Sequence, residues 1–399
     1  MTSLKQGTIL TMNRGSGTLK ATLYEVKDEP ALVLSIAVER AGTSAARVKI
    51  VSATSGTLCD RAIESREENA DLTAIFDWLS ERGYAGQLIA AGHRLVYGGA
   101  HYTEPQRIGP ELLTELKELA RLDPDHMPEA IRGIRFIAQR FPKLPQVASF
   151  DTAFHASLPK VARMYALPRG MYDEGIRRYG FHGISCEYIL QELRSTDGAR
   201  AQGRVIVAHL GNGASMTAVR NGRSVDTSMG FTPLEGLVMG TRSGDIDPAA
   251  VLYIQEQRKI SPEETSSLLN RESGLLGVSG ISADMRDLLQ KEAGDSCAAE
   301  AVELFCYRAK KYLGAYTAAL GGLDVLVFSG GIGENAPEIR ERICAGLEFL
   351  GIELDAALNR TNAGLISSSH SRVRVRVIQT DEDWMIAQHV LAVLRGTKS

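Results

Sequence analysis

The chain lacks paired cysteines, long apolar runs and any strong imbalance of charge. Its five cysteines are scattered without a CxxC pair, which disfavours structural zinc and a disulfide framework and suits reduced thiols. No apolar run approaches the roughly 18 residues of a membrane span, and the first residues lack the pattern of a signal peptide. The net charge of −3, without a basic stretch, argues against a nucleic-acid partner. We therefore expect a cytoplasmic protein.

Two motifs that are common among nucleotide and metal enzymes are missing as well. The chain contains neither a GxxxxGK(S/T) P-loop nor an HExxH metal motif. What it does contain is an ordinary globular composition, with 44% apolar and 23% charged residues. At 399 residues it is too long for one ordinary core, so two domains are expected.

Strand-like and helix-like segments alternate along the chain, and this alternation predicts an α/β protein. The expected strands are Ile9–Met12, Leu19–Val26, Ala31–Val38, Gln87–Ala91, Val147–Phe150, Val205–His209, Ser215–Val219, Val325–Phe328 and Val373–Ile378. The expected helices are Pro110–Ala120, Pro337–Leu347 and Trp384–Leu394, the last of which should return to pack on the first half.

The two halves of the chain repeat one order of segments. Gly15-Ser16-Gly17 and Gly211-Asn212-Gly213 each lie between two strands, and aligning them keeps the apolar residues in step. Later in each half a strand runs into a glycine pair, Gly98-Gly99 or Gly330-Gly331, and a helix follows. This repeat predicts a duplicated fold with a cleft between its halves. The alternative is chance, because strand–glycine–strand patterns are common.

Glycine-rich turns on matching strands favour phosphate binding. Glycine lets the backbone approach an anion closely and turn its N–H groups toward it. Lys20, just after the first turn, would add positive charge there. The alternative is that each turn serves only the fold.

The segment Gly331–Ala336 has the loose GxGxxA form of a dinucleotide fingerprint. It follows an apolar strand, and Glu353 lies roughly 20 residues further on. A Rossmann domain would need several further strands, yet few residues remain. We therefore favour a glycine loop that lies against an adenosine and its phosphates, and keep an NAD-dependent dehydrogenase as the rival interpretation.

Charged residues beside apolar strands and glycines are candidates for ligand binding. Arg94 and Arg242 have glycines nearby, and their planar forks of donors suit a carboxylate, a phosphate or, for either one alone, a surface ion pair. Asp151 follows an apolar strand and would face the crevice. His182 lies beside aromatic residues and suits a core position as well as a site. The acids of Thr380–Asp383 suit either a helix N-terminus or Mg²⁺.

Taken together, these segments resemble the acetate kinase family, within the sugar kinase, heat-shock ATPase and actin superfamily. The resemblance extends from Asn13 to Glu382. It implies two duplicated ribonuclease H-like (actin-like ATPase) domains with a central cleft, residues 1–152 plus 385–399 and residues 153–384. Its most specific parts are Phe150–His155, Tyr179–Gly183, His209–Ser215, Asp226–Pro248 and Gly330–Asn335.

The resemblance also implies an activity and a set of roles. The activity is reversible, ATP-dependent phosphorylation of a short-chain carboxylate, acetate to acetyl phosphate, usually by a homodimer. Arg94 would bind the carboxylate, and Asn13 and Glu382 would hold Mg²⁺, or Mn²⁺ in its place. The catalytic residues would be Asp151, His182 and Arg242. The ATP site would comprise Lys20, His209, Leu210, Gly211, Asn212, Gly213, Asp284, Met285, Arg286, Gly331, Ile332, Gly333, Glu334 and Asn335.

Several positions depart from the family pattern. Gly17 and Thr18 replace two serines of the first turn, and Tyr97 replaces a histidine. Asp125 stands where the family has a leucine that helps to line the pocket for the acetate methyl group, and a carboxylate there would be costly unless paired or turned away. Propionate or another small carboxylate is therefore an alternative acceptor. A superfamily ATPase without an acyl acceptor is a further alternative, although Arg94 argues against it.

The expected chemistry follows from the charge of the substrates. A carboxylate has a pKa of about 4 and is ionised at neutral pH, so it needs no general base. The difficulty is to bring one anion onto another, which calls for cationic groups and positioning. We therefore expect direct in-line transfer, with Arg94 on the substrate and with Arg242 and His182 on the phosphoryl oxygens. Asp151 would orient an arginine or the waters of Mg²⁺.

Overall fold

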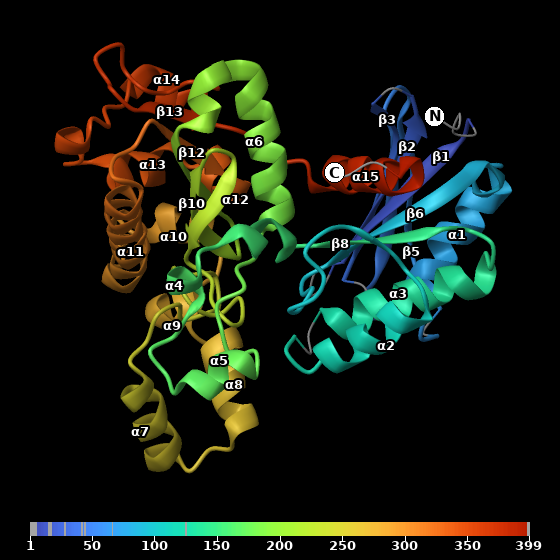
Figure 1. Ribbon diagram of the computed structural model, residues 1–399, viewed down its shortest axis with the longest axis horizontal. Helices are drawn as coiled ribbons and strands as arrows, with labels where there is room; N and C mark the ends of the chain where they lie inside the picture. Colours follow the sequence, from blue (N-terminus) through green and yellow to red (C-terminus); the bar gives the residue numbers. More distant parts are fainter. Residues whose placement is uncertain are drawn as a thin grey trace. The chain divides into compact units, whose positions relative to one another are not determined.

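The computed structural model describes residues 6–14, 18–27, 29–40, 43, 45–65, 67–123 and 126–396 (Figure 1). The chain forms two compact units, one of Met1–Ala153 with Asp381–Ser399 and one of Phe154–Thr380. Asp381–Trp384 thus group with the first unit, whereas the boundary predicted from the sequence placed them in the second.

Within the described residues, the first unit contains a mixed sheet of eight strands in the order β5-β4-β3-β2-β1-β6-β8-β7. β6 lies parallel to both β1 and β8, and the other neighbours are antiparallel. The strands are β1 Thr8–Arg14, β2 Thr18–Val26, β3 Pro30–Glu39, β4 Arg47–Ser52, β5 Gly56–Ala62, β6 Leu88–Leu95, β7 Gln106–Arg107 and β8 Gln146–Phe150.

Both faces of this sheet are covered by helices, because successive side chains of a strand point to opposite faces. Leu10 belongs to a core cluster with Phe76 of α1 and Ile137 of α3, whereas Ile9 packs with Val390 of α15. The helix near the chain's end therefore does return to the first unit. The helices are α1 Ala70–Glu81, α2 Pro110–Leu119, α3 Met127–Arg140 and α15 Glu382–Arg395, with the short 3₁₀ turn η1 Ala85–Gln87.

The second unit has a five-stranded mixed sheet in the order β11-β10-β9-β12-β13. β9 pairs antiparallel with β10 and parallel with β12, which in turn lies parallel to β13. The strands β3-β2-β1-β6-β8 have the same order and directions, so the predicted duplication of an α/β fold is confirmed. The strands are β9 Arg204–Leu210, β10 Ala214–Arg220, β11 Arg223–Thr227, β12 Val325–Ser329 and β13 Arg374–Val377.

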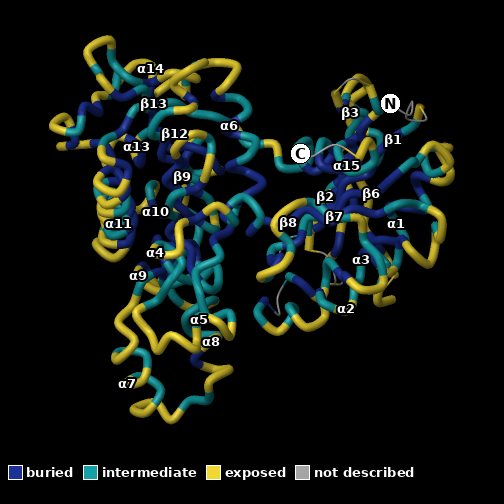
Figure 2. Tube along the Cα trace, viewed as in Figure 1, coloured by how far each residue is buried: buried dark blue, intermediate teal, exposed yellow. Residues whose placement is uncertain are grey.

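Helices pack on this second sheet as well. Ile189 and Leu193 of α6 form a core cluster with Val205 and Val327, and the interior face of α11 is buried. Figure 2 shows the central strands largely buried, whereas α7 is mostly exposed. The elements are η2 Ala153–Ser157, α4 Lys160–Arg163, α5 Arg169–Asp173, α6 Gly183–Asp197, η3 Gly198–Gln202, α7 Pro248–Arg258, α8 Pro262–Arg271, α9 Gly274–Ser279, α10 Met285–Lys291, α11 Ser296–Leu320, α12 Gly330–Asn335, α13 Pro337–Cys344, η4 Glu348–Leu350 and α14 Ala356–Arg360.

The lengths and compositions of the helices were compared with those of membrane-spanning helices. Of the helices within the described residues, none combines the length and apolar character that crossing a membrane requires.

Candidate active site

Arg94 and Asp151 meet at the carboxyl ends of two neighbouring strands of the first sheet. The sheet topology explains why the two residues are close, because the parallel strands β6 and β8 end side by side. The Arg94 guanidinium donates from Nη2 to Oδ2 of Asp151 at 2.6 Å and from Nε to Oδ1 and Oδ2 at 3.1 and 3.2 Å. The Asp151 side chain is only 1% exposed. This is a charge-assisted pair of the strong, multidentate kind.

Asn13 and Glu382 complete the cluster from two other elements. Arg94 Nη1 donates to the amide oxygen of Asn13 at 3.1 Å, and Asn13 Nδ2 donates to Glu382 Oε2 at 3.0 Å. Arg94 Nε lies 3.6 Å from the same carboxylate oxygen. Lys20 is exposed and lies opposite Asn13 in the β1–β2 ladder. The structure therefore gathers these five predicted residues at one end of the first unit.

The charges in this cluster compensate one another. Burial raises the pKa of Asp151 to about 6, although Arg94 acts in the opposite direction, so the carboxyl is ionised at neutral pH. Burial alone would lower the pKa of Arg94, but Asp151 and Glu382 outweigh it and hold that pKa above its usual value. Both members of the pair are charged, and an incoming anion meets a guanidinium that is already held in place.

The three acidic residues before and within the first turn of α15 make different contacts. Asp381 is the N-cap and accepts a hydrogen bond from the Trp384 backbone N–H at 2.8 Å. Asp383 is turned onto the sheet, where the hydroxyls of Thr11 and Thr22 donate to it at 3.4 and 3.2 Å. Only Glu382 of the three faces Asn13 and Arg94. The helix-cap interpretation is therefore correct for Asp381, and Glu382 is the acid that lies beside Asn13 and Arg94.

Asn13 and Glu382 are a suitable donor set for Mg²⁺. An amide oxygen and a carboxylate oxygen are hard donors, and Mg²⁺ takes one or two protein oxygens while keeping several waters. Across the described residues, no group of three or more histidines, cysteines or acids is arranged to hold a metal. The chemistry of this pair suits an ion that is shared with phosphates better than a closed protein site.

In the second unit, His182 lies at the start of α6 against the β9–β10 hairpin. Its backbone has φ 58°, a left-handed conformation that costs energy for a non-glycine residue and is frequent at functional sites. Its Nδ1 lies 3.0 Å from the Ser215 hydroxyl, and its ring is 4.5 Å from that of His209, centroid to centroid. His182 is therefore held by the hairpin rather than buried as an ordinary core residue.

Gly213 lies close to both His182 and Arg242. A methyl group placed on Gly213 would lie 3.5 Å from His182 Nε2 and 3.6 Å from Arg242 Nη1. Arg242 is oriented by a hydrogen bond from Nη1 to the Pro233 carbonyl at 3.3 Å. An imidazole, a guanidinium and a glycine backbone thus converge at the end of the second sheet, which is a suitable environment for a phosphoryl group.

The segment Gly330–Asn335 is next to this hairpin and differs from the predicted loop. It is the short helix α12, entered through Gly330 at φ 76°, where a side chain would meet the Leu210 carbonyl at 2.7 Å. A methyl group on Gly211 would lie 3.8 Å from the Gly331 nitrogen. Glu334 accepts a hydrogen bond from the Gly330 N–H at 2.9 Å, and Asn335 Nδ2 donates to the Gly331 carbonyl at 3.0 Å. The glycines leave backbone open to close approach.

The Asp284–Arg286 segment is connected to the hairpin through Gly240. The Gly240 N–H donates to the Asn212 carbonyl at 3.0 Å, and a methyl group on Gly240 would lie 3.2 Å from the Ala283 carbonyl. Asp284 is the N-cap of α10, and the exposed Arg286 guanidinium binds it through Nη2 and Nε. Ile332, Gly333, His209, Leu210 and Met285 lie in the same elements.

A model of the acetokinase family matches residues 8–388 of the chain. The chain belongs to the acetokinase family. The acetate kinase of Rhodopseudomonas palustris is 46% identical over 394 residues, which are 97% of this chain and 98% of that protein. The acetate kinase of Methylocella silvestris is 51% identical over 324 residues, 81% of this chain and 80% of its own.

Solved structures of acetokinases also match this fold. The acetate kinase of Porphyromonas gingivalis has a TM-score of 0.88 at 37% identity, covering 97% of this chain and 100% of its own. A propionate kinase from Francisella tularensis has a TM-score of 0.91 at 39% identity, covering 96% and 98%. The predicted family and the predicted class of two duplicated α/β domains are confirmed, and the dehydrogenase interpretation of Gly331–Ala336 is abandoned.

One contact residue of this acetokinase site was not predicted from the sequence, and some residues considered in the sequence lie elsewhere. Ser215, the partner of His182, was not predicted, although its place two residues after Gly213 was a usable signal. His155 is a core residue, bonded to Ser224 and to the Phe181 carbonyl. Tyr97 is buried, being 1% exposed. The departures at Gly17 and Asp125, and the first glycine turn itself, lie outside the described residues.

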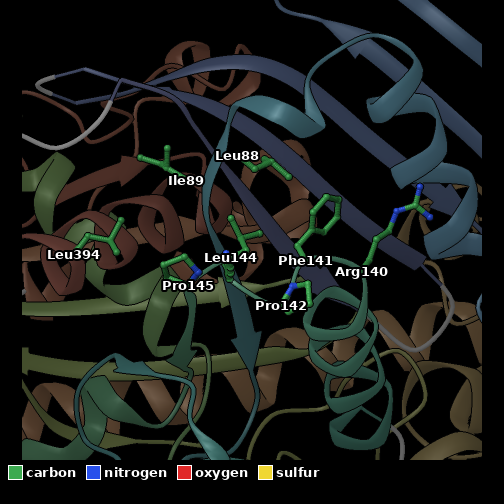
Figure 3. A pocket seen from close by; sticks show the side chains of 9 residues that line it. Leu88, Ile89, Arg140, Phe141, Pro142, Leu144, Pro145 and Leu394 are labelled. Carbon is green, nitrogen blue, oxygen red and sulfur yellow. The ribbon is translucent and has the colours of Figure 1, made fainter.

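A cavity of about 690 Å³ opens at the other end of the first sheet (Figure 3). Leu88 at the start of β6 and Pro145 just before β8 line it, together with Phe141 and Leu394. Arg94 and Asp151 lie at the opposite ends of these strands. The cavity is mainly apolar, and none of the predicted site residues lines it.

Proposed function

We propose that this chain transfers the γ-phosphoryl group of ATP to a short-chain carboxylate, with acetate as the first substrate to test. The observation that carries the proposal is the cluster of Arg94, Asp151, Asn13 and Glu382, in a chain whose relatives are acetate kinases. Propionate is the second candidate, because a structure that matches the whole fold is a propionate kinase.

In the first unit, Arg94 binds the carboxylate. Its guanidinium is charged, positioned from three sides and 17% exposed, so part of it is accessible to a ligand. Asp151 is assigned to holding Arg94 and not to proton abstraction. Its oxygens already accept three hydrogen bonds from the guanidinium, and a carboxylate substrate has no proton to lose at neutral pH.

In the second unit, Arg242 and His182 bind the transferring phosphoryl group. Because phosphoryl transfer depends on positioning and charge stabilisation, a preorganised guanidinium and imidazole supply the main catalytic contribution. Ser215 fixes the His182 ring through Nδ1, which directs Nε2 toward Gly213. Gly211, Gly213 and Gly331 allow the backbone to lie against the phosphates, and the Asp284–Arg286 segment completes the nucleotide site.

Mg²⁺ fits beside the carboxylate-binding cluster, where Asn13 and Glu382 would hold it. Bound there with its waters, the ion would neutralise negative charge on the nucleotide phosphates. Lys20, opposite Asn13 on β2, adds an exposed positive charge at the same end of the sheet.

We also propose that the enzyme is a homodimer. α7 has no buried residue, and its Leu252 and Tyr253 side chains are 66% and 62% exposed. Ile246, just before this helix, is 41% exposed. Large apolar side chains that gather on one exposed element favour a protein–protein contact.

The proposed activity is tested by a hydroxamate assay with MgATP and a panel of acetate, propionate, butyrate and succinate. We expect acyl phosphate from acetate or propionate, and a loss of at least about 100-fold in Arg94→Ala. Hydrolysis of ATP at one rate with and without every carboxylate would instead establish an ATPase without an acyl acceptor.

A further inference from the structure

Four charged side chains form a closed ring behind the end of β1. Arg14 Nη1 lies 2.7 Å from Asp71 Oδ2, and Arg14 Nη2 lies 2.6 Å from Glu129 Oε2. Arg132 joins the same two acids, with Nη1 3.3 Å from Asp71 Oδ1 and Nη2 2.7 Å from Glu129 Oε2. Each acid is shared by two arginines, so four ion pairs connect three elements of the first unit.

The ring contacts β1 on the face of the sheet opposite to the Asn13 side chain. Neighbouring residues of a strand face opposite sides, so Asn13 faces Glu382 of α15 while Arg14 faces α1 and α3. Asp71 and Glu129 both lie in the first turn of their helices, where a negative charge is favoured. The end of β1 is thereby fixed to the N-termini of two helices.

Apolar packing leaves a gap at this end of the strand. The residues that line this small cavity are Met12, Arg14, Leu19, Leu72, His93, Arg94, Glu129, Ala130 and Gly133. A methyl group placed on Gly133 of α3 would find no atom within 4 Å. The ion pair of Arg14 with Glu129 therefore bridges a gap between β1 and α3, in addition to the apolar contacts that Met12 makes with the core.

Three of the four members of the ring are shielded from water. Arg14, Asp71 and Arg132 are 10%, 4% and 15% exposed, whereas Glu129 is 39% exposed. Burial would raise the pKa of Asp71, but Arg14 and Arg132 outweigh burial and keep that pKa below its usual value. Buried ion pairs add little net stability compared with apolar packing, so their expected effect is on geometry.

We propose that Arg14 is a positioning residue for carboxylate binding, acting through Asn13 on Arg94. Arg14 fixes the backbone at the end of β1, and this backbone determines the position of the neighbouring Asn13. The amide oxygen of Asn13 accepts a hydrogen bond from Arg94 Nη1 at 3.1 Å and thereby orients the guanidinium. This inference rests on the proposed function, because it assigns the Arg94 cluster to the carboxylate. No part of Arg14 is required to touch a substrate.

The test compares Arg14→Met with Arg140→Met. Arg140 is the matched control, since its 2.7 Å bond to Asp77 also joins α3 to α1 but lies at the far end of α3. We expect Arg14→Met to lower kcat/KM for acetate about 10- to 100-fold, because a small misplacement of a binding group is costly. The Kd for an ATP analogue measured without Mg²⁺ should change less than about twofold, since the proposed nucleotide-binding residues other than Lys20 lie in the second unit.

A second variant keeps the proposal testable if Arg14→Met does not fold. Glu129→Gln breaks one side of the ring and should lower kcat/KM for acetate about 3- to 10-fold, and Arg14→Lys should recover part of the activity. In the double variant Arg14→Met/Glu129→Gln, the loss should be smaller than the product of the two single losses, because both act through one contact.

The outcomes separate the two proposals. If the wild-type chain phosphorylates no carboxylate, the proposed function fails. If the wild type is active but Arg14→Met and Glu129→Gln have the same carboxylate kinetics as Arg140→Met, the positioning role fails. An equal loss in acetate kinetics and in nucleotide affinity would also contradict it, because that pattern indicates a general loss of structure.

Discussion

Nδ1 of His182 and the hydroxyl of Ser215 are joined by a 3.0 Å hydrogen bond, from the N-terminus of α6 to the start of β10. This bond fixes the rotation of the imidazole and thereby the place of its other nitrogen near Gly213. Ser215 is therefore a positioning residue for His182.

Ser215→Ala should lower kcat about 10-fold, because the imidazole loses the partner that fixes its ring. Ser224→Ala is the matched control, since that serine bonds His155, a histidine of the core, at 2.9 Å. Steady-state kinetics should separate the two variants, with Ser224→Ala changing kcat less than twofold. Equal kcat values for both variants would contradict the role of Ser215.

Asp151→Asn should lower kcat/KM for the carboxylate about 10²-fold, because Arg94 loses the carboxylate that holds it. Asp324→Asn provides the control, as Asp324 pairs with Arg204 in a comparable geometry at 2.6 Å but away from the site. Kinetics with varied acetate at saturating MgATP measure the effect. A variant that keeps more than a fifth of the activity would refute the assignment.

Arg242→Ala should lower kcat about 10²–10³-fold by removing a cation from the phosphoryl group. Arg308→Ala, which breaks a 3.4 Å pair with Asp245 in the same unit, should keep most of its activity. The hydroxamate assay measures both. A loss of less than fivefold in Arg242→Ala would count against direct phosphoryl binding.

Burial lowers the pKa of His155 from 6.5 to about 4, which makes stability depend on pH. Between these values the unfolded chain binds the proton that the folded chain does not, so stability falls as pH drops from 6.5 to 4. The loss reaches roughly 3 kcal/mol for this one residue. Urea unfolding at pH 7 and pH 5 should show it. His155→Gln should reduce the dependence but not abolish it, because burial also lowers the pKa of His93 to about 4. His370→Gln, at an exposed histidine, is the control. If the free energy of unfolding depends on pH equally in both variants, His155 is excluded as a source of the dependence.

Leu252→Glu should weaken the proposed dimer, because it places a charge on the exposed apolar side of α7. Sedimentation velocity at several concentrations should show a shift toward the monomer. Leu358→Glu is a control at another exposed leucine, 41% accessible. A wild-type chain that sediments as a monomer throughout would remove the dimer proposal.

The sequence predicted the central strands well, because each is a short run of apolar residues between turns. Val325–Phe328 and Val147–Phe150 agree with β12 and β8 to within one residue at each end. The edge strand β5 was not predicted, since its exposed, polar residues resemble a loop. Hydrophobic periodicity reports burial, and β5 has no buried residue.

The partners within the site were harder to predict than its members. Arg94 and Asp151 are 57 residues apart in sequence, and only the parallel pairing of their strands brings them together. Arg14 lies beside a glycine-rich turn and gave no sequence signal, because its partners Asp71 and Glu129 come from two distant helices. Pairing of charges across elements is a property of topology, which single-sequence patterns do not contain.

The 369 residues that separate Asn13 from Glu382 set the order in which the first unit matures on the ribosome. Its strands emerge before the second unit, but α15, which covers Ile9 and Ala90 and supplies Glu382, is translated only after that whole unit. Until then one face of the nascent sheet has no covering helix of its own. The synthesis of the first unit therefore begins before that of the second unit and is completed after it, which gives chaperones a long interval in which to bind the first unit.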